Sequence, residues 1–375
     1  MCGRCSINMD VPLDGNEITR YSRHLNLPQV GLEGQVKLKD ASIVVVGAGG
    51  LGSPVLLYLA AVGVGKIGII DNDVVELSNL QRQIIHSNSR IGESKAESAA
   101  SRISDLNPRI EVLPMNLRLN NENALEILRE FDVVIDGTDN FETRYIIGDI
   151  CEELGIPWIF GSIHRFDGQV STFNYKNGPN YRDLFPSPPP LELAPNCEEA
   201  GVLGVLPGMI GAIQATESIK IILGIGEILR GKLLTLDALT MEMRILKFSA
   251  NSNRPNVDLD NNRAVFDMLE ISPVEYQNKK NNGWETFLLD VRRGDEEEIT
   301  RISGTDLRIE HLLIPDRVSE LPKDKDIVVY CRSGFRSAAV TRFLSELGIF
   351  SGNIYNLRGG IHEWSDTVDN NIIKY

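Results

Sequence analysis

Cysteine is scarce in this chain of 375 residues. It occurs five times, at Cys2, Cys5, Cys151, Cys197 and Cys331. An odd number of widely spaced cysteines does not suit the disulfide framework of small secreted proteins. Cys2 and Cys5 form a C-x-x-C pair, but no second pair accompanies them to complete a tetrahedral metal site. Any chemistry of cysteine in this chain is therefore expected from single residues.

Long apolar runs and an excess of positive charge are also missing. No apolar run approaches the roughly 20 residues that span a bilayer, and residues 1–17 contain no apolar core of a signal peptide. The formal net charge is −14 at pH 7, which argues against nucleic acid or an anionic membrane as a partner. We expect a cytoplasmic protein, and its length predicts two domains.

The first motif lies between residues 43 and 83. A β-branched run at 43–46 leads into the glycine-rich sequence GAGGLG (47–52), then into an apolar segment with helical spacing and a second apolar run that ends at Asp71. Glycines let backbone N–H groups approach a phosphate, and Asp71 offers a carboxylate to a ribose hydroxyl. Taken alone, this order of strand, glycine turn, helix and strand favours a nicotinamide-dependent oxidoreductase.

Polar residues beyond Asp71 favour a different ligand. The segment SNLQRQ (78–83) contains Arg82, Lys95 follows, and Asp139 comes after another apolar run. A nicotinamide site needs few cations beyond its glycine turn, whereas Arg82 and Lys95 suit a triphosphate whose charge grows during attack at the α-phosphate. Asp139 could hold the accompanying Mg²⁺. Ordinary surface charges near the mouth of a nucleotide-binding fold are the alternative.

Together these motifs resemble the ubiquitin-activating-enzyme-like superfamily, and most closely its MoeB, ThiF and HesA branch. The similar segments are GAGGLG, DNDVVELSNLQRQ, IGESKAESA and GTDNFETR. The resemblance implies an enzyme that uses ATP and Mg²⁺ to adenylate the C-terminal glycine of a ubiquitin-like sulfur-carrier protein ending in Gly-Gly. It implies a nucleotide site made of Gly49, Gly50, Asp71, Ser78, Asn79, Leu80, Gln81, Arg82, Lys95, Asp139 and Asn140.

The resemblance also implies a homodimer. In this family the second arginine of an R-Y-x-R pattern reaches into the ATP site of the other subunit, and the pattern occupies residues 20–23 here. By this resemblance Arg23 would reach into the ATP site of the other subunit. The alternative is that Arg23 is an ordinary arginine on a helix surface. We expect catalytic roles for Arg23, Arg82, Lys95 and Asp139, and Asp139 is the expected metal ligand.

Helical and strand patterns alternate after the glycine turn. We expect helices near 93–105, 121–130, 141–154 and 209–223, and strands near 110–114, 132–136, 157–161, 233–237 and 244–248. This alternation predicts an α/β fold with a Rossmann-like, mostly parallel sheet that binds its ligand at the carboxyl ends of the strands. The segment GQVSTFNY (168–175) has the pattern of an exposed strand, and residues 17–41 have the pattern of a helix followed by a connecting arm.

Prolines crowd the segment that follows, at positions 179, 186, 188, 189, 190 and 195. We expect a long extended loop, because proline supports neither a helix interior nor a central strand. Cys197 lies in this segment. The resemblance implies a crossover loop whose cysteine attacks or holds the activated carrier, and a small loop residue without chemistry is the alternative.

One difference from the family concerns zinc. Its members commonly bind a structural zinc through two C-x-x-C pairs, one just before an LFP stretch and one after the last strand. Here the positions of the first pair are Asn180 and Asp183, and no cysteine occurs between residues 198 and 330. We therefore expect no structural zinc, since the thiolate ligands are missing.

A second domain is expected after a polar, asparagine-rich segment at 249–264, which we interpret as a flexible linker between domains 1–248 and 265–375. In the second domain Cys331 follows a strand and precedes a helix. Backbone N–H groups of residues 332–336 and the helix N-terminus would stabilise a thiolate there. Arg332 and Arg336 add positive charge, and because they flank Cys331 we do not expect a buried structural cysteine.

The loop CRSGFR, with DVR (290–292) and LRGGIHEW (357–364), resembles the rhodanese family, a smaller α/β domain whose cysteine carries a persulfide. Phosphatases place five residues between cysteine and arginine, and only four occur here. The implied persulfide loop consists of Arg332, Ser333, Gly334, Phe335 and Arg336. Arg292 is interpreted as a structural ion-pair partner.

The two domains together predict adenylation of a carrier followed by sulfur transfer. A persulfide on Cys331, loaded by a donor such as a cysteine desulfurase, would attack the adenylate, or a thioester on Cys197, and reductive release would then give a thiocarboxylate. Molybdopterin biosynthesis is the expected pathway, and carriers for thiamine, cysteine or tRNA thiolation are alternatives. A nicotinamide-dependent oxidoreductase and a non-catalytic binding module also stay open.

Overall fold

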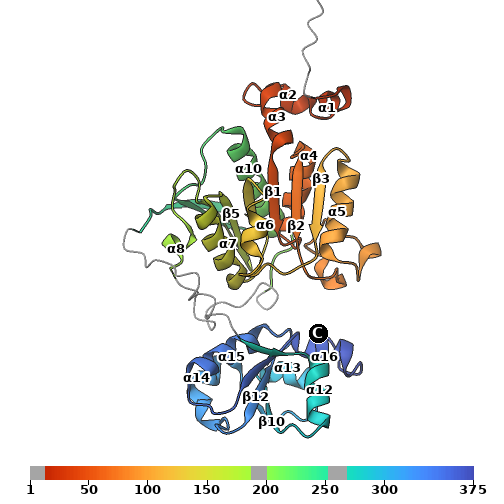
Figure 1. Ribbon diagram of the computed structural model, residues 1–375, viewed down its shortest axis with the longest axis vertical. Coiled ribbons are helices and arrows are strands. Elements are labelled where there is room, and N and C mark those ends of the chain that lie inside the picture. Colours follow the sequence, from red (N-terminus) through yellow and green to blue (C-terminus); the bar gives the residue numbers. More distant parts are fainter. Residues whose placement is uncertain (1–12, 187–200, 252–267) are drawn as a thin grey trace, which may run out of the picture. The chain divides into compact units, whose positions relative to one another are not determined.

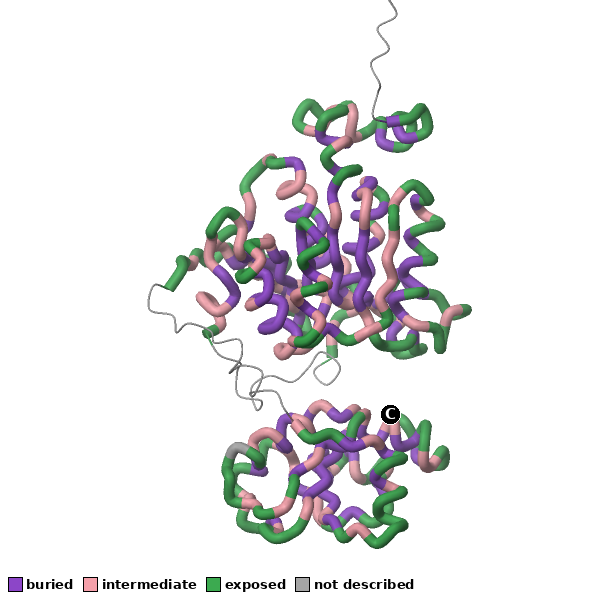
Figure 2. Tube along the Cα trace, in the orientation of Figure 1, coloured by how far each residue is buried: buried purple, intermediate pink, exposed green. Residues whose placement is uncertain are grey.

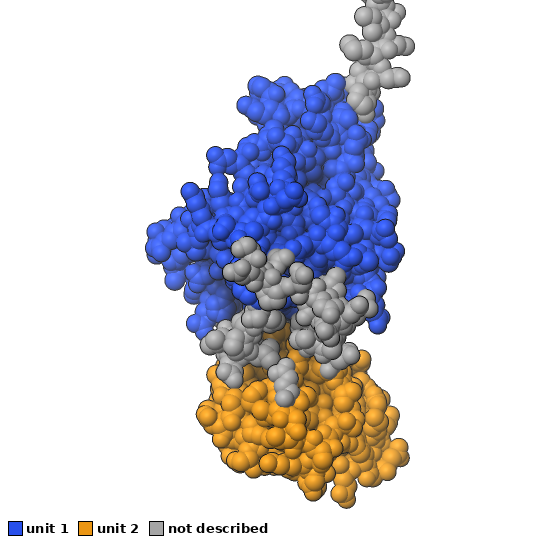
Figure 3. All heavy atoms as spheres, turned by 60° about the vertical axis from the view of Figure 1, so that its left-hand side comes forward, with its two compact units in different colours: residues 1–188, 196–257 blue, residues 189–195, 258–375 orange. Residues whose placement is uncertain are grey.

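The computed structural model describes residues 13–186, 201–251 and 268–375. They form two compact units, residues 13–186 with 201–251 in one and residues 268–375 in the other (Figure 3). Cys2, Cys5, Cys197 and most of the expected linker lie outside the described residues. The boundaries of the two domains therefore stay predictions.

The first unit is built on an eight-stranded sheet with the strand order β3-β2-β1-β4-β5-β6-β7-β8 (Figure 1). Neighbours from β3 to β5 pair in parallel, and the pairs from β5 to β8 are antiparallel. The prediction of a Rossmann-like, mostly parallel sheet is confirmed, with an antiparallel extension on one side. The strands are β1 (Ser42–Val46), β2 (Lys66–Ile70), β3 (Glu111–Met115), β4 (Val133–Asp136), β5 (Trp158–His164), β6 (Asp167–Phe173), β7 (Lys232–Asp237) and β8 (Glu242–Lys247).

Strand β1 shows how both faces of this sheet are covered. Its β-branched residues favour extended backbone, and successive side chains point to opposite faces. Ile43 and Val45 pack in a core with α3, α4, α5 and α10, whereas Val44 and Val46 pack with α6 and α7. All these β1 residues are buried (Figure 2). The helices are α1 (Gly15–Arg20), α2 (Ser22–Leu25), α3 (Gly31–Asp40), α4 (Gly52–Val62), α5 (Lys95–Leu106), α6 (Ala124–Leu128), α7 (Phe141–Leu154), α8 (Tyr181–Leu184) and α10 (Leu206–Leu223), with 3-10 turns η1 (Leu77–Asn79) and η2 (Asn88–Arg90).

Three expectations about single elements are wrong. Strand β6 is not exposed, because β5 and β7 pair with its two edges and Ile210 of α10 packs against Gly168. The segment before the LFP stretch is not wholly extended: Asn180 accepts a hydrogen bond from the Asp183 backbone N–H and so caps the short helix α8. The expected arm near residue 35 is itself helical, as α3.

The second unit is a parallel five-stranded sheet with the order β11-β10-β12-β13-β9. One face packs on α15 and the other on α12 and α16, which confirms the smaller α/β domain. The strands are β9 (Leu269–Ile271), β10 (Thr286–Asp290), β11 (Leu307–Arg308), β12 (Asp326–Tyr330) and β13 (Ile354–Leu357). The helices are α12 (Pro273–Asn281), α13 (Gly294–Ile299), α14 (Ile314–Arg317), α15 (Phe335–Glu346) and α16 (Gly360–Thr367), with 3-10 turns η5 (His311–Leu313) and η6 (Val318–Glu320).

Within the described ranges, no helix has the length and apolar character needed to cross a bilayer.

Candidate functional site

The glycine turn joins β1 to α4 at the carboxyl edge of the first sheet. Gly47 has a φ of +97°, and a Cβ there would lie 2.7 Å from the carbonyl oxygen of Gly137. A Cβ on Gly52 would come within 1.9 Å of the Gly47 carbonyl oxygen. Neither position accepts another residue, because Gly47 packs against the segment that follows β4 and Gly52 packs against the backbone of the turn itself. Its middle, Gly49 and Gly50, faces Gln83 and Pro207.

Ala48, inside this turn, is held from two sides. Its N–H donates to Asp71 Oδ2 at 2.8 Å, and Nε2 of His86 lies 2.9 Å from its carbonyl oxygen. The other ring nitrogen of His86 lies 2.9 Å from the Ser98 hydroxyl. Burial lowers the pKa of His86, so the imidazole is neutral, with Nε2 donating to Ala48 and Nδ1 accepting from Ser98. The sequence analysis did not identify His86, although a histidine directly after the apolar pair 84–85 is a signal.

Lys95, the first residue of α5, is buried among carboxylates. Its Nζ lies 2.8 Å from Asp73 Oδ2. Burial acts to lower the pKa of Lys95, but the charges of Asp73, Asp71 and Asp139 outweigh it, so the pKa is raised and the ammonium stays charged. Burial in turn raises the pKa of Asp71, against the opposing charge of Lys95. The structure thus brings Lys95, Asp71 and Asp139 together and adds Asp73 to them.

The segment 78–83 contains side chains that stabilise its own backbone and side chains that could contact a ligand. Asn79 is buried, and its side-chain oxygen accepts from the Glu76 N–H at 3.1 Å, which closes η1. Arg82 is half-buried and donates to the Ser78 carbonyl at 3.2 Å. Gln83 is 4% exposed, and its Oε1 has no partner within the described part of the chain. Ser78 and Gln81 are exposed, and Leu80 is half-buried.

Asp139 and Asn140 lie between β4 and α7. Asp139 is exposed, and Asn140 caps α7 by accepting from the Thr143 N–H at 2.9 Å. The loop is anchored by a buried ion pair that sequence reasoning missed, Asp136 Oδ2 to Arg144 Nε at 3.2 Å. Arg144 was visible as the last residue of GTDNFETR, where an arginine on an otherwise apolar helix face is a signal.

Arg23 has an exposed position in α2, away from the sheet. Its role toward a second subunit stays a prediction.

The positions at which the family holds zinc are occupied by hydrogen bonds. Asp183 Oδ2 accepts from the Asn180 N–H at 2.8 Å, and Asp183 Oδ1 accepts from the Asn251 N–H at 2.9 Å. These bonds tie the segment after β8 to α8. No cluster of three or more His, Cys, Asp or Glu residues that could hold a metal occurs in the described ranges. The expectation that zinc is absent stays a prediction.

In the second unit Cys331 stands between β12 and α15. It is fully buried, and the Ser337 hydroxyl lies 3.5 Å from its sulfur. The first N–H groups of α16 donate to the loop, from Ile361 to the Cys331 carbonyl and from His362 to the Arg332 carbonyl, each at 3.0 Å. The expectation that flanking arginines keep this cysteine out of the core is wrong. The predicted ring of N–H groups around the sulfur stays a prediction.

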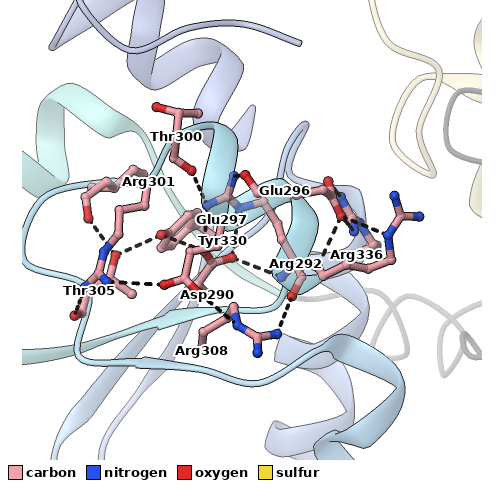
Figure 4. Close-up of polar contacts among 12 residues, drawn as sticks. Asp290, Arg292, Glu296, Glu297, Thr300, Arg301, Thr305, Arg308, Tyr330 and Arg336 are labelled. Atoms are coloured by element: carbon pink, nitrogen blue, oxygen red, sulfur yellow. Dashed lines mark hydrogen bonds and ion pairs between the residues drawn. The ribbon is translucent and has the colours of Figure 1, made fainter.

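Burial of the flanking Arg336 is possible because a carboxylate accompanies it. Arg336 donates to both oxygens of Glu296, at 2.6 and 2.7 Å (Figure 4). Burial acts to raise the pKa of Glu296, but the bonds and charge of Arg336 outweigh it and lower that pKa to about 2. The interpretation of Arg292 is confirmed, since it is buried with Asp290 at 2.7 Å.

The donor set of the first unit fits a nucleoside triphosphate. Backbone N–H groups of the glycine turn, the α4 N-terminus, Lys95 and Arg82 provide donors for phosphates, and Asp71 retains acceptor capacity for a hydroxyl. One exposed carboxylate, Asp139, suits Mg²⁺, which commonly binds one or two carboxylates and completes its shell with phosphate oxygens and water. The fold and this site define a nucleotide-binding α/β enzyme joined to a unit with a cysteine loop.

Comparison with known proteins identifies the family. The ThiF family matches residues 21–257, and the Rhodanese-like domain matches residues 272–367. The chain belongs to the ThiF family and carries a rhodanese-like second domain. It is an enzyme, an adenylyltransferase and sulfurtransferase, and its fold supports the use of ATP.

Several relatives match nearly the whole chain. It is 41% identical to the probable adenylyltransferase/sulfurtransferase MoeZ of Mycobacterium tuberculosis, covering 97% of this chain and 96% of the relative. It is 43% identical to the probable molybdopterin-synthase adenylyltransferase of Porphyra purpurea, with 94% of each covered. The adenylyltransferase and sulfurtransferase MOCS3 of Culex quinquefasciatus is 39% identical, covering 96% and 90%. Family membership favours adenylyl transfer over the nicotinamide alternative.

A solved structure supports the fold. That of E. coli MccB with AMPCPP and MccA aligns with a TM-score of 0.55 at 23% identity, covering 65% of this chain and 76% of that one.

Proposed function

We propose that this enzyme adenylates the C-terminal glycine of a ubiquitin-like sulfur-carrier protein ending in Gly-Gly and then transfers sulfur from Cys331 to form a thiocarboxylate. The observation that carries the adenylation half is the buried ammonium of Lys95, which is paired with Asp73 and lies within the influence of the Asp71 and Asp139 charges. A charge kept out of water acts strongly on a phosphate that comes close to it.

Adenylation requires groups that bind the nucleotide in line with the incoming carboxylate. Phosphates would contact backbone N–H groups at Gly49 and Gly50, and the ribose would contact Asp71. Ser78, Asn79, Leu80, Gln81 and Asn140 would border the nucleotide. Asp139 would hold Mg²⁺, which neutralises part of the phosphate charge when bound.

In the first step a carboxylate oxygen of the carrier attacks the α-phosphorus. The new O–P bond forms, the bond from the α-phosphorus to the bridging oxygen breaks, and pyrophosphate leaves. Arg82 and Lys95, together with Arg23 from the other subunit of a homodimer, would stabilise the charge on the transferring group. The product, an acyl-adenylate, is electrophilic because AMP is a good leaving group.

In the second step the terminal sulfur of a Cys331 persulfide attacks the acyl carbon. A C–S bond forms, the C–O bond to AMP breaks, and the carrier is left joined to Cys331 through a disulfide. The thiolate of an external thiol reductant then attacks the Cys331 sulfur and releases the thiocarboxylate. A second thiol reduces the disulfide that remains. The same release follows if the persulfide attacks a thioester on Cys197, with the Cys197 thiolate as the leaving group, instead of the adenylate. A sulfur donor such as a cysteine desulfurase would reload Cys331.

The pathway follows from the identity of the carrier. The name of the Porphyra relative supports molybdopterin biosynthesis. Carriers of thiamine, cysteine or tRNA thiolation are the competing substrates. Mixing the enzyme with each candidate carrier and following AMP release by mass spectrometry distinguishes them.

Exchange of pyrophosphate into ATP tests the first step. We expect carrier-dependent exchange in the wild-type protein and a loss of about 100-fold in Arg82→Ala, the size of effect seen when one donor to a transition-state charge is removed. Arg102→Ala, on the exposed surface of α5, is the matched control and should keep wild-type exchange. An unchanged rate in Arg82→Ala would contradict the role of Arg82. Cys331→Ser should keep exchange but make no thiocarboxylate.

A further inference from the structure

Tyr375 is distant in sequence from the Cys331 loop but packs against it. The guanidinium carbon of Arg332, the residue after Cys331, lies 5.9 Å from the centroid of the Tyr375 ring. The Tyr375 hydroxyl accepts from Arg292 at 2.8 Å and donates to Glu296 Oε1 at 3.1 Å. Ring and hydroxyl therefore contact different charged groups.

The hydroxyl joins two ion pairs that hold the two ends of the loop. Before Cys331, the Tyr330 hydroxyl donates to Asp290 at 2.9 Å, and Asp290 is paired with Arg292. After the loop, Arg336 is paired with Glu296 (Figure 4). Because Tyr375 bonds to Arg292 and Glu296, it connects these pairs. Burial raises the pKa of Tyr375 to about 12, so its hydroxyl keeps the proton that it donates to Glu296.

The Tyr375 ring lies over the Arg332 guanidinium. The Arg332 Nε is buried and has no hydrogen-bond partner in the described part of the chain. The Arg332 backbone is linked to Tyr375 through His362. The His362 N–H donates to the Arg332 carbonyl, and the His362 ring lies 3.3 Å from the Tyr375 carbonyl oxygen. A cation with an unused, buried donor, next to the sulfur-bearing residue, suits an anionic ligand.

We propose that Tyr375 is a positioning residue: its ring holds the Arg332 guanidinium in place beside the Cys331 loop, and this sets the affinity of the loop for an anionic sulfur donor. The hydroxyl has a separate task, which is to stabilise the ion pairs beneath the loop. The proposal rests on the sulfurtransferase activity of the second domain and involves neither ATP nor a carrier protein. Its failure is thus separable from failure of carrier adenylation.

Steady-state transfer of sulfur from thiosulfate to cyanide by the full chain tests the separate roles of the Tyr375 ring and hydroxyl. In Tyr375→Leu we expect the KM for thiosulfate to rise twofold to fivefold with kcat little changed, the range given by an exposed cation and ring pair. Tyr375→Phe keeps the ring, so its KM should match the wild type although its melting temperature falls. Ile373→Ala, at a residue 62% exposed, is the matched control and should change neither quantity.

A double-mutant cycle identifies the route of the effect. If Tyr375 acts through Arg332, Arg332→Ala should raise KM by itself, and adding Tyr375→Leu should raise it no further. Equal KM values in Tyr375→Leu and the wild type, or independent effects in the double variant, would overturn the proposal. If the wild-type chain does not turn over thiosulfate, the rate of Cys331 alkylation by iodoacetate relative to iodoacetamide gives the same comparison. Tyr375→Leu should then lower the ratio, and an unchanged ratio would overturn the proposal.

Discussion

At the scale of the residue, the glycine turn between β1 and α4 depends on a histidine that binds no ligand in the proposed reaction. His86 satisfies the Ala48 carbonyl on one side of its ring and the Ser98 hydroxyl on the other. Both groups are inside the protein, where a polar atom without a partner costs about 1–3 kcal/mol. Ala48 in turn orients the N–H groups of the glycine turn that follows it.

His86→Leu should therefore weaken ATP binding as well as stability. If about 1 kcal/mol of the lost hydrogen bonding falls on the nucleotide-bound turn, KM for ATP rises about fivefold. Exchange kinetics at varied ATP, with urea unfolding of the same samples, measure the two effects. His164→Leu, on an exposed histidine of the same unit, is the control. A wild-type KM in His86→Leu would show that the turn holds its shape without the imidazole.

The residues found from the sequence were those whose neighbours in the chain already form a motif. Asp71 and Lys95 belong to such motifs, and they do lie together in the structure. His86 and Asp136 act through contacts with residues 38 positions before and 8 positions after them, respectively. Only the folded backbone brings such partners together, so local signals could mark these residues but could not specify which partners they contact.

At the scale of the element, local signals decided which boundaries could be predicted. Helix α7 spans the residues expected for it because Asn140 caps its first turn and Gly155, at φ +69°, ends it in the left-handed conformation. Strand β6 was misjudged because its burial depends on neighbours on both edges, which no pattern within the strand reveals. Helix α8 is not predicted from the sequence, because the prolines around it favour an extended loop and its capping signal is short.

The capping box of α8, which Asn180 and Asp183 form together, also carries a prediction. Asp183 bonds to backbone N–H groups of Asn180 and Asn251, so it joins two segments that are distant in sequence. Asp183→Ala should lower the free energy of unfolding by about 1–2 kcal/mol, a typical cost of losing a cap. Faster hydrogen exchange confined to residues near 180–186 and 248–251 would accompany it. Glu130→Ala, at an exposed carboxylate, is the control, and equal stability of both variants would contradict a joining role for Asp183.

At the scale of the whole molecule, the two units should respond to acid separately, because their buried titratable groups differ. In the second unit, burial lowers the pKa of His311 from 6.5 to about 4, with the Arg336 and Arg293 charges acting in the same direction and Glu296 against them. In the same unit Glu296 has a pKa lowered to about 2. Both groups bind more protons unfolded than folded at mildly acidic pH, so acid destabilises this unit.

The two groups act in different pH ranges, which allows them to be told apart. His311 is neutral when folded, so the stability it contributes is full above pH 6.5 and is lost as pH falls toward 4. Glu296 is ionised when folded, and its contribution is lost below its ordinary value of 4.5, toward pH 2. His311→Asn should therefore flatten the loss between pH 6.5 and 4.5 while keeping the steeper loss below it. Hydrogen exchange of residues 268–375 across this pH range measures the stability of the unit. If stability falls between pH 6.5 and 4.5 as steeply in His311→Asn as in the wild type, the loss in that range does not come from His311, and the assignment is contradicted.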